Sequence, residues 1–207
     1  MYYFISPHLD DAILSAGGLI NYLKDRKKIK IITVFTEGDK LFLKRRIEDM
    51  NVCRYLGIEY LHLGFTDVLW RDIFNLKKER ILVKAITNKI KKLIKNSEDP
   101  IIFAPLSIGN HIDHRIVNKI CKDNFTNVIY WEDYPYNLKS NLLPEFIKKN
   151  RFLYFEYKKR LFEKEKLIKF YDSQIMDLFR DKPIILKKEK YYFNFDQTNL
   201  KFSSAFF

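Results

Sequence analysis

Glycine and proline are scarce in this chain, with six of each among 207 residues. Collagen-like repeats, flexible linkers and most disordered tracts are rich in these residues, so their scarcity excludes those classes. Because 47% of the residues are apolar, the composition instead predicts a packed globular protein. The length predicts a single domain over residues 1–207, with a core at about 1–136 and a C-terminal extension at about 137–207.

Long apolar runs are also missing. The longest stretch without Asp, Glu, Lys or Arg is Pro100–Ile112, which is 13 residues, whereas a bilayer-spanning helix needs about 20. The first residues, Met1–Ile5, lack the basic start and cleavage site of a signal peptide. The sequence therefore predicts no transmembrane segment and a cytoplasmic location.

Cysteine is limited to Cys53 and Cys121, which lie far apart and form no C-x-x-C pair. This spacing argues against a disulfide framework and against a cysteine zinc knuckle. We expect both to be small buried side chains in a reducing compartment.

Acidic residues are fewer than basic ones, 26 against 38, and the net charge is +12. A positive field favours anionic partners. Most of the lysines alternate with apolar residues, however, as on solvated helix faces, and we find no zinc finger, helix-turn-helix spacing or RNA-binding aromatic motif. We therefore expect no nucleic-acid partner, although a basic nucleic-acid or membrane-surface binding protein without catalysis is an alternative hypothesis.

The apolar pattern alternates between strands and helices along the first two thirds of the chain. Apolar runs without polar alternation predict buried parallel strands, and apolar residues at helical spacing predict helices between them. We expect strands at 2–6, 30–36, 59–63, 101–105 and 128–131, and helices at 11–27, 40–56, 76–96 and 114–123. This order predicts an open, mostly parallel, Rossmann-like α/β sheet with helices on both faces.

The pattern changes in the C-terminal extension, which is rich in lysine and aromatic residues. Here we expect one helix at 158–179 and strand-like segments at 184–187 and 191–195.

Histidines and carboxylates follow two of the predicted strands. His8, Asp10 and Asp11 come after the first strand, and His111-Ile112-Asp113-His114 follows the strand at 101–105. Ligands bind at the carboxyl ends of the strands in open α/β sheets, so both loops are expected at one edge. Imidazole and carboxylate are ligands that Zn²⁺ accepts, and the sequence therefore predicts a metal site.

A simpler interpretation exists for each loop alone. Asp10 is placed to cap the following helix, and His111 and His114 are typical of polar residues at a helix start. Capping does not require two such loops at the ends of separate strands, which favours the metal site. His62, inside a predicted strand, is expected to be a partly buried structural histidine.

The two motifs resemble a known family. Pro7-His8-Leu9-Asp10-Asp11-Ala12, with His111-Ile112-Asp113-His114-Arg115 downstream, is similar to the PIG-L/LmbE family of zinc-dependent N-acetylglucosamine deacetylases. The similarity extends over roughly residues 2–136. It also includes Arg45-Arg46, Leu63-Gly64-x-x-Asp67, Glu132-Asp133-Tyr134-Pro135-Tyr136 and, in the extension, Tyr171-x-Ser173-Gln174.

The resemblance implies roles for the individual residues. His8, Asp11 and His114 would be the metal ligands, and Asp10 would be the general base. His111 would stabilise the oxyanion, and Asp113 would orient an imidazole.

Arg45, Arg46 and Asp67 are candidates for binding sugar hydroxyls or a phosphate, since guanidinium donates in a rigid fork and carboxylate accepts from hydroxyls. A helix-surface arginine is the alternative for one of the two arginines. Glu132 and Asp133 follow a strand and either border the site or cap a turn.

The implied function is a metal-dependent hydrolase that removes acetyl from an N-acetylated amino sugar, a small-molecule conjugate that could be anionic. Zn²⁺ is the expected cofactor, and Fe²⁺ or Co²⁺ also suits two nitrogens and an oxygen. A zinc hydrolase acting on another amide is the alternative within the same class.

Overall fold

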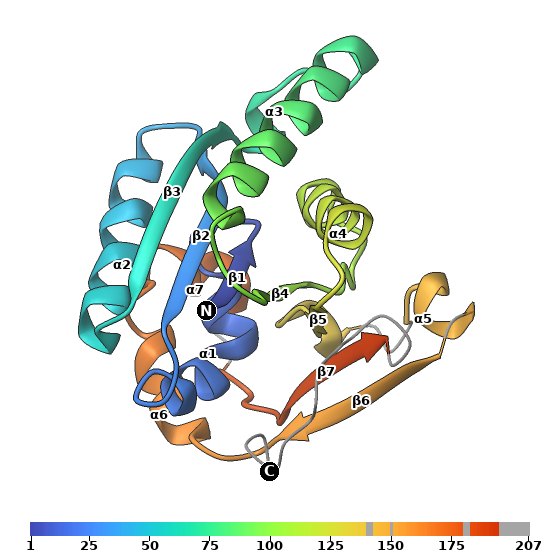
Figure 1. The fold of residues 1–207 in the computed structure, drawn as a ribbon. Helices are drawn as coiled ribbons and strands as arrows, with labels where there is room; N and C mark the ends of the chain where they lie inside the picture. Colours follow the sequence, from blue (N-terminus) through green and yellow to red (C-terminus); the bar gives the residue numbers. More distant parts are fainter. Residues whose placement is uncertain (140–142, 150, 180–182, 195–207) are drawn as a thin grey trace.

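The computed structural model of the chain describes residues 1–139, 143–149, 151–179 and 183–194. Its seven strands form one sheet in the order β3-β2-β1-β4-β5-β7-β6 (Figure 1). The strands are β1 (Tyr2–Ser6), β2 (Ile29–Glu37), β3 (Glu59–Thr66), β4 (Ile101–Pro105), β5 (Val128–Trp131), β6 (Phe152–Tyr157) and β7 (Glu189–Asn194). The α-helices are α1 (Asp11–Leu23), α2 (Leu41–Leu56), α3 (Leu76–Ile94), α4 (Ile112–Asn124), α5 (Glu145–Lys149), α6 (Leu161–Ile168) and α7 (Asp172–Phe179), with short 3₁₀ turns η1 (Val68–Trp70) and η2 (Tyr136–Leu138).

Strands β1 to β5 run parallel, and β7 and β6 continue the sheet in antiparallel pairing. From β1 the chain moves outward through β2 to β3, then returns to the other side of β1 with β4 and β5. The carboxyl ends of β1 and β4 are therefore neighbours at the point where the strand order reverses, which is where open α/β sheets bind ligands. The structure confirms the predicted open, mostly parallel α/β sheet.

The two faces of the sheet carry separate apolar cores. Successive strand residues point to opposite faces. Tyr2 and Phe4 of β1 accordingly join the core under α1 and α2, whereas Tyr3 and Ile5 join the core under α3 and α4. Cys53 and Cys121 are both buried free thiols, one in each core, as predicted.

The predicted elements up to residue 131 are all present, with ends that differ by four residues or fewer. Helix α1 ends at Leu23 instead of residue 27, and β3 continues to Thr66 instead of residue 63. Helix α4 begins at Ile112, two residues earlier than predicted, with His111 at its N-cap.

The extension differs from the prediction. The single helix expected at 158–179 is wrong, because the chain forms α6 and α7 with a break at Tyr171. Tyr171 is buried, and its carbonyl accepts from the amides of Gln174 and Ile175, so a new helix begins there. Strand β6 (Phe152–Tyr157) was not predicted from the sequence.

The strand expected at 184–187 is also wrong, because residues 183–188 form no regular structure. Ile184 and Leu186 pack against a small apolar cluster with Leu14 and Phe179, which accounts for their alternating pattern. The strand expected at 191–195 is present as β7 through Asn194, and Phe195 lies outside the described residues.

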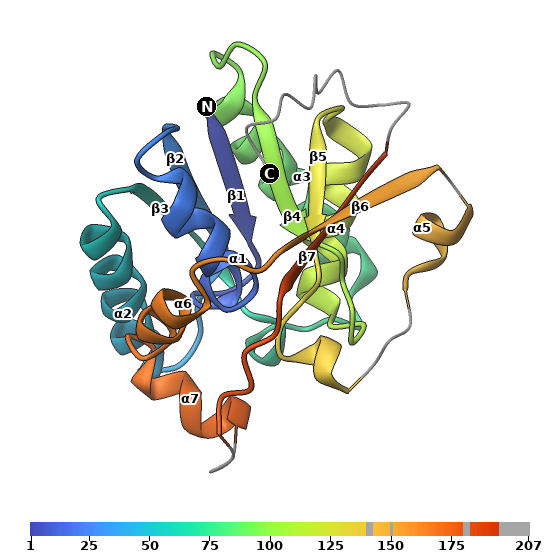
Figure 2. The same cartoon turned by 90° about the horizontal axis from the view of Figure 1, so that it is seen from below.

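The extension joins the core through the pairing of β7 with β5 and through helix packing on α1 and α2 (Figure 2). Helix α6 lies against α1, and α7 lies against α2. A Cβ on Gly18 would come within 3.1 Å of Glu189 Oε1 and 3.2 Å of the Lys159 carbonyl, so this position requires glycine for close approach. Gly17 and Gly18 thus allow α1 to pack closely against α6 and the start of β7.

Candidate metal centre

The first loop of the site is a tight turn between β1 and α1. Ser6 Oγ donates to the His8 carbonyl at 2.7 Å and accepts from the Ala12 amide at 3.1 Å. The His8 amide in turn donates to Asp11 Oδ2 at 2.9 Å. These bonds hold His8 and Asp11 at fixed positions above the carboxyl end of β1.

Asp10 does not cap α1, although it occupies the N-cap position. Its side chain makes no capping hydrogen bond, and the residue is buried. Burial, and then the neighbouring Asp11 carboxylate, raise the pKa of Asp10 to about 7. The structure therefore places a buried carboxylate, uncommitted to the helix, directly beside Asp11.

The second loop, between β4 and α4, has a left-handed backbone at three of its residues. Ser107, Gly109 and Asn110 have φ of 69°, 86° and 61°. A Cβ on Gly109 would lie 2.7 Å from the Tyr136 ring, so glycine is required there for space as well as for conformation. This loop delivers His111 and then His114 to the carboxyl edge of the sheet.

The two loops meet at one oxygen atom. Asp11 Oδ2 lies 3.1 Å from His8 Nδ1 and 3.1 Å from His114 Nε2. The His111 ring is edge-on to both other imidazoles, with centroids 4.9 Å from His8 and 5.2 Å from His114. The structure thus brings the four predicted residues His8, Asp11, His111 and His114 together.

His114 has its other ring nitrogen occupied. Its Nδ1 lies 2.6 Å from Asp133 Oδ1, while its Nε2 is buried without a hydrogen bond. Burial lowers the pKa of His114, but Asp11 and Asp133 outweigh that effect and raise it to about 9. The sequence left open whether Asp133 borders the site or caps a turn. In the structure Asp133 orients His114, and its Oδ2 also accepts from the Ile108 amide at 2.8 Å.

His8 is held from its far side by two carboxylates. Its Nε2 lies 3.1 Å from Asp113 Oδ2 and 3.3 Å from Asp67 Oδ2. Although burial opposes it, hydrogen bonding to Asp11 and Asp113 holds the pKa of His8 well above its ordinary value. Asp113 thus contacts an imidazole, and that imidazole is His8.

Arg71 supports this arrangement and was not singled out from the sequence. Its Nη2 lies 2.6 Å from Asp113 Oδ1, its Nε donates to Glu79 at 2.8 Å, and its Nη1 donates to the Thr66 carbonyl at 2.9 Å. The guanidinium also stacks over the Phe35 ring. No motif marks Arg71, because its role depends on a contact between η1 and α4 that sequence spacing does not reveal.

His111 differs electrostatically from the other two histidines. Burial, then the proximity of His8 and His114, lower its pKa to about 4. Its Nδ1 is buried and makes no hydrogen bond. The structure therefore places an imidazole with an uncommitted ring nitrogen beside His8 and His114.

The predicted substrate-binding residues fall into different places. Asp67 reaches the site through His8, and its other oxygen accepts from the Leu69 amide at 2.9 Å. Arg45 has a buried Nε without a partner, and its charge acts on Asp10. Arg46 donates to the Thr36 carbonyl at 2.8 Å and pairs with Glu37 at 2.8 Å, so its guanidinium has structural partners.

His62 is a structural histidine, as expected. Its Nε2 lies 2.7 Å from Asp49 Oδ2, and Asp49 also accepts from the Tyr171 hydroxyl at 2.8 Å.

The donor set fits a divalent cation. The buried His114 Nε2 has no hydrogen bond and lies 3.1 Å from Asp11 Oδ2, so a nitrogen and an oxygen that could both donate electron pairs to a cation lie side by side. Among the described residues, the groups able to surround an ion are His8–His111–His114 and His8–Asp67–Asp113. His8 is common to both, and imidazole nitrogen with carboxylate oxygen suits zinc and related ions.

The chain is thus an α/β protein with a candidate metal centre, formed by histidines and carboxylates where the strand order of the sheet reverses. The family model PIG-L, described as GlcNAc-PI de-N-acetylase, matches residues 3–125, which is more than half of the chain. The chain therefore belongs to the PIG-L family of de-N-acetylases, and the resemblance seen in its motifs is confirmed.

Individual proteins show the same relationship. The 2′-N-acetylparomamine deacetylase of Streptomyces fradiae is 26% identical over 156 residues, which cover 64% of this chain and 56% of that enzyme's length. The zinc-inhibited form of teicoplanin deacetylase Orf2 superposes with a TM-score of 0.76 at 20% identity, covering 92% of this chain and 96% of that one. The N,N′-diacetylchitobiose deacetylase of Pyrococcus horikoshii gives a TM-score of 0.54 at 21% identity, covering 87% and 73%.

No helix among the described residues is long and apolar enough to span a bilayer.

Proposed function

We propose that this chain hydrolyses the N-acetyl group of an N-acetylated amino sugar and that it uses a divalent cation, with zinc as the first candidate and Fe²⁺ or Co²⁺ as the others. The observation that carries the proposal is the convergence of His8, Asp11 and His114 on one point from loops about a hundred residues apart, within a chain of the PIG-L family.

His8, Asp11 and His114 are the proposed ligands. Asp11 Oδ2 lies 3.1 Å from a nitrogen of each histidine, which supports Asp11 as the carboxylate between the two imidazoles. A cation bound here would supply Lewis acidity, which polarises an acetamide carbonyl and lowers the pKa of bound water to about 7. Asp113 and Asp133 hold the opposite nitrogens of the two imidazoles and thereby fix their orientation.

Asp10 is the proposed general base. It is adjacent to Asp11, buried, and makes no capping bond that would occupy its oxygens. A carboxylate in that position accepts a proton from attacking water and returns a proton to the departing amine.

His111 is the proposed oxyanion partner. Its uncommitted ring nitrogen and its position beside His8 and His114 suit a donor to the developing negative charge on the former carbonyl oxygen. Its role requires a neutral ring with a proton on the nitrogen that faces substrate.

Arg45 and Asp67 are the proposed contacts to the sugar. Arg45 acts electrostatically on Asp10, and Asp67 touches His8, so each borders the proposed centre from a different element. Arg46, already bonded to Thr36 and Glu37, is the weaker candidate. The relatives are named as deacetylases of 2′-N-acetylparomamine, teicoplanin and N,N′-diacetylchitobiose, which supports an amino-sugar conjugate as the substrate class.

Acetate release from a panel of N-acetylglucosamine conjugates and simple acetamides tests the proposal directly. Protein purified without chelator should contain about one equivalent of a divalent metal by elemental analysis. Asp10→Asn should keep that metal and lose turnover by two or more orders of magnitude. A fully active Asp10→Asn variant would refute the assigned base, and release from acetamides without a sugar would favour a broader amidase.

The cytoplasm is the proposed compartment, because both cysteines are buried free thiols.

A further inference from the structure

The segment from η1 to the start of α3 exposes an unusual amount of apolar surface. Leu69 is 81% exposed, Trp70 53%, Phe74 89% and Leu76 67%. Single exposed apolar residues are common on protein surfaces. Four large ones within eight residues form a patch of the kind that marks an interaction site.

This segment is anchored firmly on its inner side. The Val68 amide donates to Asp113 Oδ2 at 3.0 Å, and Arg71 forms its ion pair with the same carboxylate. The apolar side chains therefore protrude from a fixed base rather than from a loose loop. Figure 1 shows the first turns of α3 projecting beyond the neighbouring helices at the carboxyl edge of the sheet.

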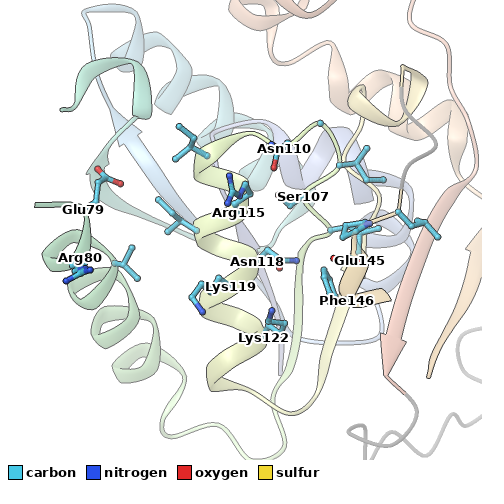
Figure 3. Close-up of a pocket in the computed structure, with 18 of the residues that line it drawn as sticks. Glu79, Arg80, Ser107, Asn110, Arg115, Asn118, Lys119, Lys122, Glu145 and Phe146 are labelled. Carbon is cyan, nitrogen blue, oxygen red and sulfur yellow. The ribbon is translucent and has the colours of Figure 1, made fainter. Parts of the chain in front are cut away.

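A large groove continues the patch along α4. Its volume is about 1420 Å³, and Leu76 lines it together with Val83 of α3 and Ile112 and Ile116 of α4. Figure 3 shows basic side chains from both helices around it, including Arg80 and Arg115. Since Leu76 belongs to both, the patch and the groove form one continuous surface.

The basic groups of this surface are largely free. In the part of the chain that the structure describes, no acidic group pairs with Arg80 or Arg115, whereas Lys119 pairs with Asp123 at 2.7 Å. Lys77 and Lys78 directly follow Leu76. Apolar side chains and unpaired cations thus lie side by side, on a chain of net charge +12.

We propose that the docking surface, defined as Leu69, Trp70, Phe74 and Leu76 with Arg80 and Arg115, binds an anionic phospholipid bilayer. Leu69 and Phe74 are largely exposed, and side chains that protrude in this way suit insertion into a fluid apolar phase better than a flat protein interface. Arginine and lysine beside them match the phosphates of anionic lipids. The protein would bind peripherally. The segment of Val68 and Arg71, which contacts Asp113, would then lie at the lipid surface.

Trp70 supplies an internal probe for this proposal. The chain has two tryptophans, and Trp131 is fully buried, so a change on docking reports on Trp70. Vesicles of equal parts phosphatidylcholine and phosphatidylglycerol should shift the emission to shorter wavelength and sediment the protein. Pure phosphatidylcholine vesicles should bind much less, and added salt should release the protein. Trp70→Phe should abolish the spectral shift.

Two paired variants separate the contributions of apolar and charged groups. Leu69→Ser with Phe74→Ser should weaken binding by roughly 100-fold, since each large side chain moved out of water contributes about ten-fold or more. Arg80→Gln with Arg115→Gln should weaken binding less and flatten its salt dependence. The controls are Phe162→Ser, an exposed aromatic on α6, and Lys28→Gln with Arg54→Gln, which removes the same charge from exposed positions elsewhere. Circular dichroism confirms that each variant is folded.

Three results would overturn the proposal. The first is failure of the protein to bind the anionic vesicles. The second is a result in which Lys28→Gln with Arg54→Gln weakens vesicle binding as much as Arg80→Gln with Arg115→Gln does, while Leu69→Ser with Phe74→Ser has no effect. Binding would then be nonspecific electrostatic attraction. The third is a dimer that the serine pair converts to a monomer without any vesicle binding, which would make this surface an interface between copies of the chain.

Discussion

The carboxyl-edge loops and the C-terminal extension both bury ionisable groups, but the two regions differ in whether those groups have partners. In the extension, Lys164 and Glu189 are buried as an ion pair at 2.9 Å, and Glu189 also accepts from the amides of Gly18 and Leu19. In the loops, Asp10 makes no capping bond and His111 Nδ1 has no partner. Buried groups that are satisfied hold a fold together, whereas buried groups left uncommitted are available to a ligand.

The two regions nevertheless meet on α1. Asp11 opens this helix at the proposed metal centre, while Glu189 bonds to its middle turn, and Lys164 donates to the Ser15 carbonyl at 3.3 Å. The contrast predicts that changes in the loops act on metal and turnover, and that changes in the extension act on stability. Single substitutions in each region test this division.

Replacing a proposed ligand should have the largest effect. His114→Ala removes one of the two imidazoles beside Asp11 and leaves Asp133 without its partner. We expect metal content to fall to background and turnover to fall by more than about 100-fold. Loss of a residue that only orients a ligand typically costs about 10 to 100-fold, so the larger loss would mark a ligand. Elemental analysis and acetate release measure the two quantities. His62→Ala, a histidine outside the centre, is the control for metal content, and equal metal in the two variants would contradict the ligand assignment.

Arg71 should come next, because it acts through Asp113. Arg71→Met removes the charge 2.6 Å from Asp113 Oδ1 while keeping most of the side-chain stem. Metal affinity, measured by competition with a chromophoric chelator, should fall by about 10 to 100-fold. Arg71→Lys should recover part of this loss, since it restores the charge without the guanidinium fork. Arg54→Met, at an exposed position on α2, should bind metal as the parent does.

Unchanged metal affinity in Arg71→Met would show that Asp113 is held in place without it. A matching loss in Arg54→Met would show that the effect is one of net charge and would remove Arg71 from the account of the site.

The sequence was sufficient for the strands and helices up to residue 131 and for the clustering of His8, Asp11, His111 and His114, and the reasons are local. Strands such as Tyr2–Ser6 and Ile101–Pro105 are buried on both faces, and the histidines and carboxylates of the site follow them directly in the chain. Arg71, Asp133 and β6 were missed or left undecided because their roles come from contacts between distant elements. Tyr171, at the break between α6 and α7, likewise donates to Asp49, 122 positions away, a contact that helical periodicity does not reveal.

Glu189 should matter to stability much more than to the site. Glu189→Leu leaves Lys164 buried without its partner and the amides of Gly18 and Leu19 without their acceptors. Removing one member of a buried pair costs about 3–5 kcal/mol, which denaturant unfolding measures. Lys164→Met with Glu189→Leu should recover part of this cost, but not the part that comes from the two amides. The folded Glu189→Leu variant should bind metal with an affinity close to that of the parent. If it lost as much metal affinity as Arg71→Met, the extension would contribute to the site as well as to stability.

Tyr171→Phe should give the smallest effect on the site and a modest effect on stability. The hydroxyl of Tyr171 donates to Asp49 Oδ1 at 2.8 Å, and His62 occupies the other oxygen of that carboxylate at 2.7 Å. Without the hydroxyl, a buried carboxylate oxygen loses its donor, which costs about 1–3 kcal/mol. Because Phe retains the ring, the packing of Tyr171 between α6 and α7 is preserved, and metal content and turnover should match the parent. Tyr154→Phe, an exposed tyrosine on β6, controls for removal of a hydroxyl as such. If Tyr171→Phe lowered turnover while the free energy of unfolding stayed the same, the extension would take part in the reaction and the two regions would not be separate in function.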